Sequence, residues 1–587
     1  MKQFFKFLFA SCLGTILALG VLFFGFFMIG SVFSAKDTSI PKNSVLLVEF
    51  NNFVPEKTGN VEQNPYSFEL QSSLGLQRIK DLIHHASDND NIKGIVYKTS
   101  SNTPLGMVTS TEIKKAIEEF RDSTDKFVYT YADFFTHKSY LLASASDSIF
   151  MNPNGMLEMK GYGAMIPFFK EMMDKAGIEM NIFYAGNYKS ATEPFRRNDI
   201  SPANREQTRE YLNENFELYL NEVAGSRGIS KENLLNLVNN IDLENLPEAL
   251  ENDLVDGTTY WFEFEDKLRD RLGLSDGKKI RYMDLDEYNS KVTIKRGSSK
   301  NRIAVVYAEG EVVYDSEEKA VISERKYNKI FDKIKRDKKV KAVVLRVNSP
   351  GGSAFASDAI WGEIEEIKAR GIPVIASFGD YAASGGYYIA AGADKIVSHP
   401  QTLTGSIGVF TLFPNFTNLM EDKLGIHFDT VKTSPHAVSF TPFYDLTEEE
   451  KNELTTFVDQ LYSKFLSRVA GGRGSNTDEI HEVAQGRVWT GASAYENGLV
   501  DELGDLEKAI ELAADMADIA EDYKINEYPK IKKDIFEELM MELMKQQNAS
   551  MVLSDFDKKL LDDYNKLRAV FKFREPMARL PFTLECK

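Results

Sequence analysis

Short apolar runs alternate with longer amphipathic stretches along most of the chain. The runs KAVVLRV (341–347), IPVIASF (372–378) and DKIVS (394–398) lie between segments with helical spacing. Short continuous apolar runs separated by helical segments are typical of buried parallel strands joined by crossover helices. We therefore predict an α/β fold.

Two long helices have clear start signals. Ser201 followed by Pro202 predicts an N-cap with proline at the first helical position, and Thr447 with Glu450 predicts a capping box. Both signals precede long segments with helical patterning. The two helices occupy matching places in an internal repeat.

The repeat is visible as self-similarity. Residues 126–153 and 372–400 align at a constant offset of 247 from Asp133 to Pro153. Flanking matches keep the offset between 245 and 248, as expected for a duplication. We predict two tandem domains from this duplication, a polar linker between them and a helical tail, with bounds 36–294, 302–520, 295–301 and 521–587 respectively.

The N-terminal segment predicts a membrane anchor. Residues 7–35 contain no charged side chain, and this span exceeds the roughly 20 residues needed to cross a bilayer. Lys2 and Lys6 place residues 1–6 in the cytoplasm by the positive-inside rule, so the body is expected to be extracytoplasmic. The alternative is a signal peptide cleaved after VFSA.

Charge and composition narrow the function classes. The chain has 88 acidic and 70 basic residues, for a net charge of −18, which argues against a nucleic-acid partner. Its two cysteines, Cys12 and Cys586, lie near opposite ends and predict no disulfide framework. Seven histidines without close ligand spacing give no support for a metal site, and we expect no cofactor.

The two copies differ at positions suited to chemistry. Ser384, within YAASGGYYIAAG, aligns with His137 of the first copy, whereas Lys189 aligns with Ala437 of the second. A serine hydroxyl needs an adjacent base to become a nucleophile, and lysine is one recurring base. Burial can lower the lysine pKa enough to leave a neutral amine. We predict that Ser384 and Lys189 meet between the copies as a catalytic dyad.

Glycines near the predicted nucleophile are candidates for an oxyanion hole. The motif NSPGGS follows a predicted strand and can expose the N–H of Gly351 or Gly352, and Gly385 directly follows Ser384. Backbone N–H donors of this kind stabilise the tetrahedral intermediate of acyl transfer. Tyr387 is expected in the core or a pocket wall.

These motifs carry a family resemblance. NYKSATEPF, NSPGGS, DYAASGGYYIAAGADKIV and TLTGSIGVF, in this order within a duplicated chain, resemble the long signal peptide peptidase A group of serine peptidase family S49. The resemblance implies two ClpP/crotonase-like domains and a homotetramer that degrades cleaved signal peptides in the bacterial inner (cytoplasmic) membrane. It implies a site composed of Ser384 as nucleophile, Lys189 as base, Gly352 and Gly385 as oxyanion donors, and Ser406 orienting the lysine.

Alternatives remain at this point. A crotonase-like acyl-CoA enzyme would also use glycine N–H donors but would not need Lys189, and a catalytically inactive membrane scaffold would need neither group. We favour a membrane-anchored serine endopeptidase acting on hydrophobic, extended peptides. We expect a structural role for His137, and we expect Asp133 and Asp380, which recur in both copies, to stabilise the fold.

Overall fold

The structure is a computed structural model that describes most of the chain: residues 14–15, 39–60, 74–99, 103–240, 246–294, 297–520, 522–530 and 577–579. Apart from Gly14 and Thr15, the predicted anchor at 7–35 lies outside these ranges, as does most of the predicted tail. Among the helices of the described ranges, none has both the length and the apolar character required to cross a bilayer.

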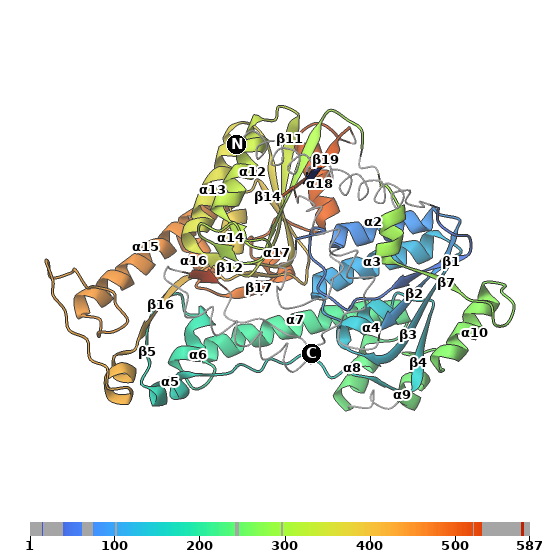
Figure 1. The fold of residues 1–587 in the computed structure, drawn as a ribbon, viewed down its shortest axis with the longest axis horizontal. Helices are drawn as coiled ribbons and strands as arrows, with labels where there is room; N and C mark the ends of the chain where they lie inside the picture. The colour runs from blue at the N-terminus through green and yellow to red at the C-terminus, as the bar shows by residue number, and fades with distance from the viewer. Residues whose placement is uncertain are drawn as a thin grey trace, which may run out of the picture.

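The first copy is built on a six-stranded parallel sheet. Its strand order is β6-β4-β3-β2-β1-β7. Helices α2 (Leu76–Ser87) and α3 (Met107–Ser123) pack together beside this sheet (Figure 1). The strands are β1 (Ser44–Val48), β2 (Ile92–Thr99), β3 (Phe127–Phe135), β4 (Ser148–Leu157), β6 (Gly257–Thr258) and β7 (Arg281–Asp284).

The second copy repeats this arrangement. Its strands follow the order β18-β14-β13-β11-β8-β19, and β15 (Leu403–Gly405) and β17 (Val488–Thr490) extend the sheet beside β13. Helices α12 (Glu324–Arg336) and α13 (Ala354–Ala369) pack together in this copy. The repeated strands are β8 (Arg302–Glu309), β11 (Val340–Ser349), β13 (Val374–Ala383), β14 (Lys395–Ser398), β18 (Glu502–Leu503) and β19 (Lys524–Tyr528). The predicted α/β class is confirmed.

Equivalent buried contacts support the duplication. The Tyr140 hydroxyl donates to the Leu254 carbonyl at 2.6 Å in the first copy, and the Tyr387 hydroxyl donates to the Leu499 carbonyl at 2.7 Å in the second. Each tyrosine is fully buried, so losing its acceptor would leave an unsatisfied hydroxyl. Both copies therefore keep the same polar contact within their cores.

The repeat continues past residue 520, which corrects our expectation of a tail that is helical from 521. Strand β19 pairs with β8 in the second copy as β7 pairs with β1 in the first. The sequence did not predict this strand. The segments KINEY of β19 and RYMD of β7 occupy equivalent positions, but their sequences are not similar. The apolar segment IFEELMMELMKQQ, also expected to be helical, lies outside the described residues.

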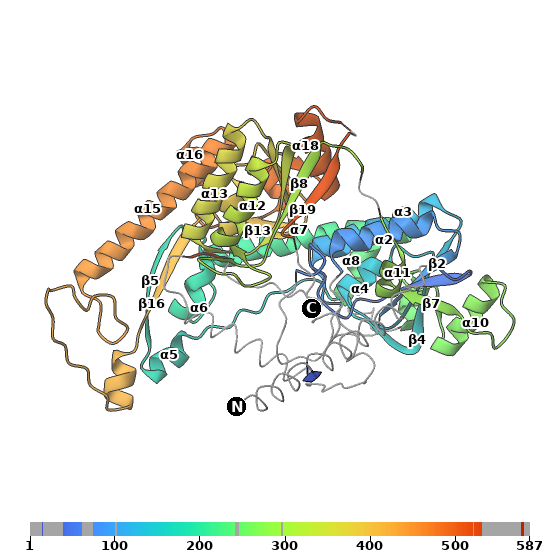
Figure 2. The ribbon, with the colours of Figure 1, turned by 45° about the horizontal axis from the view of Figure 1, so that its top comes forward.

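The two long helices begin where their caps predict. Helix α7 (Pro202–Arg227) has Ser201 as N-cap, whose side chain accepts from Asn204 N, and proline at N1. Helix α15 (Glu448–Arg473) has the predicted capping box between Thr447 and Glu450. Helix α7 belongs to the first copy but runs beneath the second and contacts β17 (Figures 1 and 2).

A third sheet joins the copies. Its order is β10-β9-β12-β20-β16-β5, and β5 of the first copy pairs antiparallel with β16 of the second along seven residues (Figure 1). This sheet lies next to the predicted catalytic residues. Its strands are β5 (Glu179–Ala185), β9 (Val312–Val313), β10 (Ile322–Ser323), β12 (Gly351–Ser353), β16 (Val409–Asn415) and β20 (Met577–Arg579).

Asp380 attaches helix α3 of the first copy to strand β13 of the second. Its carboxylate accepts hydrogen bonds from Val108 N at 2.8 Å, Thr109 N at 3.3 Å and the Thr109 hydroxyl at 2.6 Å. The N-cap residue of α3, Gly106, offers no side-chain cap of its own, and a Cβ there would lie 2.0 Å from Asp380. The second copy therefore provides the N-cap of a helix in the first.

A buried ion cluster lies beside this contact. The Arg346 side chain is fully buried on β11 and donates to Glu56 and Glu112 of the first copy, both at 2.9 Å. Its remaining amine donates to Ser377 Oγ and the Phe378 carbonyl on β13. Burial raises the pKa of Glu112, but Arg346 and a neighbouring lysine outweigh it and lower that pKa to about 2. The cluster thus holds β13, which ends one residue before Ser384, against the first copy.

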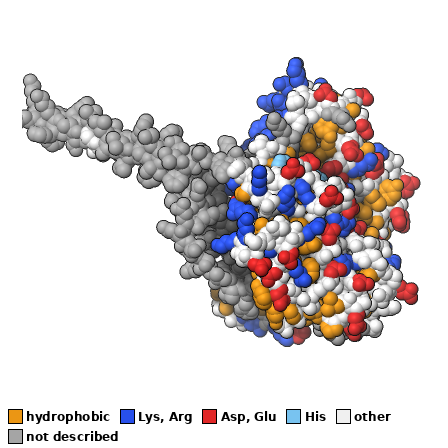
Figure 3. Space-filling model, turned by 90° about the vertical axis from the view of Figure 1, so that its right-hand side faces the viewer, with side chains coloured by type: hydrophobic (Ala, Val, Ile, Leu, Met, Phe, Trp, Pro, Cys, Tyr) orange, Lys and Arg blue, Asp and Glu red, His pale blue; other side chains and the backbone are white. Residues whose placement is uncertain are grey.

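The first copy presents mixed charge on the face turned away from the second. In Figure 3, acidic and basic side chains are interspersed with hydrophobic ones over most of the described part of this face. The predicted absence of a nucleic-acid partner stays a prediction.

We predict that Asp380→Ala lowers the free energy of unfolding by about 1–3 kcal/mol, because it removes a helix cap and leaves buried N–H donors unpaired. Urea denaturation of the whole chain measures this change. The control is Asp133→Ala, since the repeat partner Asp133 is exposed and its carboxylate accepts from Asn152 at the surface. Its effect should stay within about 0.5 kcal/mol. Equal effects at both positions would contradict the conclusion that Asp380 caps helix α3 of the other copy.

Candidate active site

Ser384 lies at the turn between β13 and helix α14 (Gly385–Ala390). Its backbone has φ 55° and ψ −115°, a strained conformation for a residue with a side chain. The turn is held on both sides, because Ser384 N donates to the Gly405 carbonyl and Tyr388 N donates to the Ser384 carbonyl, both at 2.8 Å. The hydroxyl is therefore presented at the start of a helix in a fixed orientation.

The glycine after this turn is required by packing. A Cβ at Gly386 would lie 2.7 Å from the Ser349 carbonyl, closer than real Cβ contacts. In the first copy Ser139 occupies the matching position and caps helix α4 (His137–Ala143) with Thr136. The first copy therefore uses the same turn for a helix cap and not for a nucleophile.

Lys189 reaches the second copy on a loop after β5. Tyr188 N donates to the Gln485 carbonyl at 2.9 Å, which attaches the loop to the second copy. Gly486 has φ +79°, and a Cβ there would lie 2.7 Å from the Lys189 backbone. Gln207 of helix α7 donates to the Tyr188 carbonyl at 3.0 Å and accepts from Val488 N at 3.1 Å. Both copies thus fix the lysine backbone.

The structure brings Lys189 and Ser384 together. Lys189 Nζ lies 2.8 Å from Ser384 Oγ, 3.0 Å from the Ser406 carbonyl oxygen and 3.0 Å from Ser406 Oγ. Lys189 is 1% exposed and both serines are fully buried. This burial lowers the pKa of Lys189 well below its ordinary value.

A neutral amine at Lys189 can be paired with all three of these partners. A neutral lysine has two N–H donors and one lone pair, whereas an ammonium has three donors. The Ser406 carbonyl can only accept, and Ser406 Oγ can accept as well, so these two take the N–H donors. The lone pair then faces Ser384 Oγ. In this state the amine can accept the Ser384 proton.

Ser406 is held as firmly as the nucleophile. It follows β15, has φ +50°, and its backbone N–H donates to the Arg487 carbonyl at 2.6 Å. The structure places it where the resemblance expects a lysine-orienting hydroxyl. Its carbonyl is an additional contact that the sequence did not suggest.

The two predicted oxyanion donors belong to different elements, β12 and α14. Gly385 is the first residue of α14, where backbone N–H groups lack partners within the helix. Gly352 lies on β12 with φ +154°, and a Cβ there would lie 1.9 Å from the Val312 carbonyl. Only glycine fits at this position. Because Gly352 has no side chain, its backbone can approach the neighbouring strand closely.

His137, the first-copy counterpart of Ser384, lies in an aromatic environment. It is 1% exposed, and its ring contacts Tyr162 and Tyr219 at centroid distances of 5.2 and 5.4 Å. This packing agrees with the structural role expected from the sequence.

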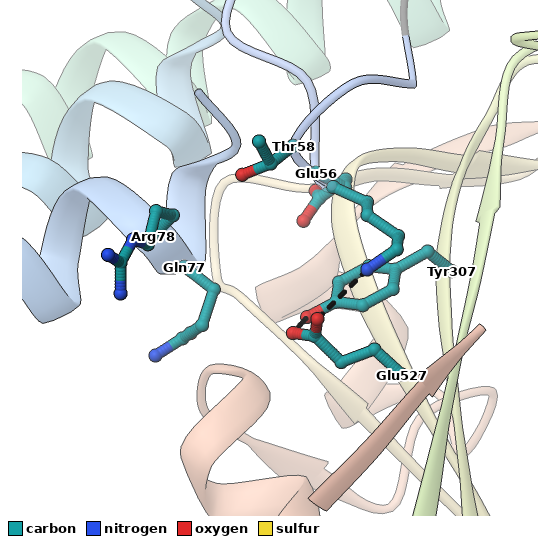
Figure 4. A pocket seen from close by; sticks show the side chains of 7 residues that line it. Glu56, Thr58, Gln77, Arg78, Tyr307 and Glu527 are labelled. Carbon is teal, nitrogen blue, oxygen red and sulfur yellow. Dashed lines mark hydrogen bonds and ion pairs between the residues drawn. The ribbon is translucent and has the colours of Figure 1, made fainter. Parts of the chain in front are cut away.

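A polar pocket of about 180 Å³ lies elsewhere between the copies (Figure 4). An ion pair of 2.9 Å between Lys57 and Glu527 crosses it, and Arg78 and Tyr307 help to line it. Neither Lys189 nor Ser384 lines this pocket. No cluster of His, Cys, Asp or Glu in the described ranges could hold a metal ion.

Sequence reasoning missed Gln207, which links the lysine loop to β17. Its amide also donates to Ser190 Oγ at 3.0 Å. An uncharged amide on a long helix, 18 positions after Lys189, gives no signal of its own in the sequence. Only the path of α7 beneath the second copy reveals it.

Comparison with known families agrees with the duplication. The model of peptidase family S49 matches residues 119–275 and 366–520, one match in each copy. The Clp protease family also matches residues 296–403.

Similar proteins include Protease 4 of Haemophilus influenzae, which is 32% identical over 87% of this chain and 86% of its own length. Protease 4 of Salmonella typhi is 36% identical over 75% of this chain and 71% of its own length. The chloroplastic serine protease SPPA of Arabidopsis thaliana is 32% identical over 78% and 68%, respectively. Among solved structures, ClpP1 from Listeria monocytogenes matches 34% of this chain and 91% of its own, at 17% identity and a TM-score of 0.22.

Lys189→Met should change how stability depends on pH. An unfolded lysine has a pKa near 10.4, whereas burial lowers that of folded Lys189, so between the two values the unfolded chain binds more protons. The natural protein therefore loses stability as pH falls through this window. The variant has no such loss, so its stability relative to the natural protein should rise as pH falls from about 10, and then level off.

Urea denaturation at a series of pH values measures this difference. Lys175→Met is the matched control, because the Lys175 side chain is 75% exposed and should give a difference that varies little with pH. A constant difference for Lys189→Met across the whole series would show that the lysine is charged in the folded protein.

Proposed function

The chain belongs to peptidase family S49 and is a serine protease, and on this premise we propose that it cleaves peptides through a dyad of Ser384 and Lys189. The two residues come from different copies and lie 195 positions apart in sequence. A single intact site therefore needs both copies.

In the first step, Ser384 Oγ attacks the carbonyl carbon of the scissile peptide bond while its proton moves to Lys189 Nζ. The lysine then carries a third N–H and a positive charge. The Ser406 carbonyl and hydroxyl, each 3.0 Å from Nζ, can accept from this ammonium. They offset part of the cost of a transient buried charge.

The substrate carbonyl oxygen becomes negative as the tetrahedral intermediate forms. We assign the backbone N–H groups of Gly352 and Gly385 to this oxyanion, where removing one donor typically costs about 3–4 kcal/mol. Gly385 opens helix α14, so the helix dipole adds to the same effect.

The remaining steps return the enzyme to its starting state. Lys189 gives its proton to the leaving nitrogen, the C–N bond breaks, and an ester to Ser384 remains. A water molecule then attacks the ester while Lys189 accepts its proton. The proton returns to Ser384 Oγ as the C–O bond breaks and the acid product leaves.

The proposal is carried by the 2.8 Å separation between Lys189 Nζ and Ser384 Oγ inside a site with almost no exposure to water. This distance lies within the range for proton transfer from nucleophile to base. Burial lowers the pKa of Lys189 and so favours the neutral amine that this step requires.

We propose hydrophobic, extended peptides as substrates, including cleaved signal peptides. The supporting features are the resemblance in the catalytic motifs and the apolar side chains beside the dyad, among them Ala191, Phe410 and Leu412. The uncharged segment 7–35 supports a single-pass anchor in the bacterial inner membrane with the body outside the cytoplasm. A homotetramer is part of the same proposal.

We predict that Ser384→Ala abolishes peptide cleavage and that Lys189→Ala lowers kcat/KM by about 10²–10⁴-fold, the usual range for a lost general base. A fluorogenic peptide with an apolar cleavage site measures both. Lys175→Ala, at an exposed position, is the control and should cleave normally.

Labelling distinguishes the alternative functions. A fluorophosphonate should modify Ser384 in the natural protein but not in Ser384→Ala, as judged by mass spectrometry of the labelled peptide. A protein that stays unlabelled and inactive would be a scaffold. Turnover that survives in Lys189→Ala, combined with acyl-CoA hydrolysis, would favour a crotonase-like enzyme.

Substrate preference gives a separate prediction. Purified protein in detergent should cleave a synthetic signal peptide with at least about tenfold higher kcat/KM than a polar peptide of equal length, since one buried apolar side chain is worth about 1.5–3 kcal/mol. Equal rates on the two peptides, or faster cleavage of folded polar proteins, would contradict the proposed substrate class.

A further inference from the structure

A short C-terminal strand lies within the third sheet, next to the dyad. Strand β20 pairs antiparallel with β12, matching Gly351 with Arg579, Gly352 with Ala578 and Ser353 with Met577. On its other side Met577 pairs with Phe410 of β16. Strand β20 therefore fills the position between the strand that carries Gly352 and the strand that follows Ser406.

The side chain of Met577 fits an apolar pocket at this position. Met577 is 5% exposed and packs with Ala191, Phe410 and Leu412. Ala191 is two residues from Lys189. Strand β20 also contacts helix α14, which begins directly after Ser384. The strand thus contacts elements that flank both Lys189 and Ser384.

A peptide substrate needs the same position. To bring its carbonyl carbon to Ser384 and its carbonyl oxygen to Gly352, an extended peptide must run beside β12. Addition of a peptide as a further strand to an open sheet edge is a common mode of peptide recognition. Backbone groups of β12 that pair with β20 cannot pair with a substrate at the same time.

We propose that strand β20 (Met577–Arg579) occupies the substrate position and competes with peptide substrates. The proposal rests on the proposed peptidase function and names its ligand class: an extended peptide with an unbranched apolar side chain in the Met577 pocket. Because the segment is part of the chain, it acts at an effective concentration on the order of millimolar, and weak pairing is sufficient.

Release of the strand should act on KM. If strand β20 occupies the substrate position about nine-tenths of the time, the apparent affinity for substrate is about tenfold weaker than in a protein whose strand is displaced. The groups that carry out the chemistry are unchanged once substrate is bound. A several-fold lower KM with unchanged kcat is therefore expected when the strand is displaced.

Met577→Asp in the full chain tests this. A carboxylate in the pocket of Ala191, Phe410 and Leu412 would be buried without a partner and should displace the strand. The matched control is Met165→Asp, because Met165 is 98% exposed and a carboxylate there would stay in contact with water. The control should keep the KM of the natural protein. A chain that ends at residue 573 provides a second variant if Met577→Asp folds poorly.

A free peptide provides a direct binding test. The peptide REPMARLPFT (574–583) should inhibit the Met577→Asp protein competitively, and the same peptide with Asp in place of Met577 should not. Fluorescence anisotropy with the labelled peptide and the double variant Ser384→Ala, Met577→Asp measures binding without catalysis, and saturable binding is expected.

These measurements separate the two proposals. Peptide binding to the double variant, together with no peptidase activity in either the natural protein or Met577→Asp, would refute the proposed function and leave the inference about the strand intact. Active protein with an unchanged KM in both Met577→Asp and the shortened chain, and with no peptide binding, would overturn this inference alone.

Discussion

The proposed chemistry depends on one buried contact, in which an amine from the first copy meets a hydroxyl from the second. The 2.8 Å separation of Lys189 Nζ and Ser384 Oγ has chemical value only if the amine is neutral. Neutrality in turn requires that water be excluded, so the copies must stay tightly joined around it. The β5–β16 pairing, the Gln207 contacts and the Asp380 cap all serve this requirement. The joint between the copies is thus a condition for the proposed chemistry as well as for stability.

The sequence predicted a large part of this arrangement because the duplication served as an internal comparison. Short apolar runs indicated the parallel strands, and capping residues indicated where α7 and α15 begin. Positions that differ between the copies singled out Ser384 and Lys189. Their meeting could be inferred because equivalent positions of two similar domains can face one another across a shared boundary. The prediction of family S49 membership is confirmed by the comparisons.

The sequence could not predict contacts that depend on how the copies are joined. Arg346 belongs to a strand that reads as apolar, and its partners Glu56 and Glu112 lie more than 200 positions away. Strand β20 has three residues, too few for a periodic pattern, and its place is set by the edges of β12 and β16. Strand β19 was missed for a related reason, since an edge strand with one buried residue carries a weak signal.

Asp133 and Asp380 show how one inherited residue came to have two roles. Both stand near the end of the equivalent strand, and we expected both to stabilise the fold. Asp133 is exposed and bonds to Asn152, whereas Asp380 is buried and caps helix α3 of the other copy. A pair of copies related by symmetry would use both residues alike. The unequal use means that the copies meet through non-equivalent surfaces, so Lys189 of the first copy faces the turn of the second copy that carries Ser384. At the equivalent turn of the first copy, His137 instead packs against Tyr162 and Tyr219 within its own copy.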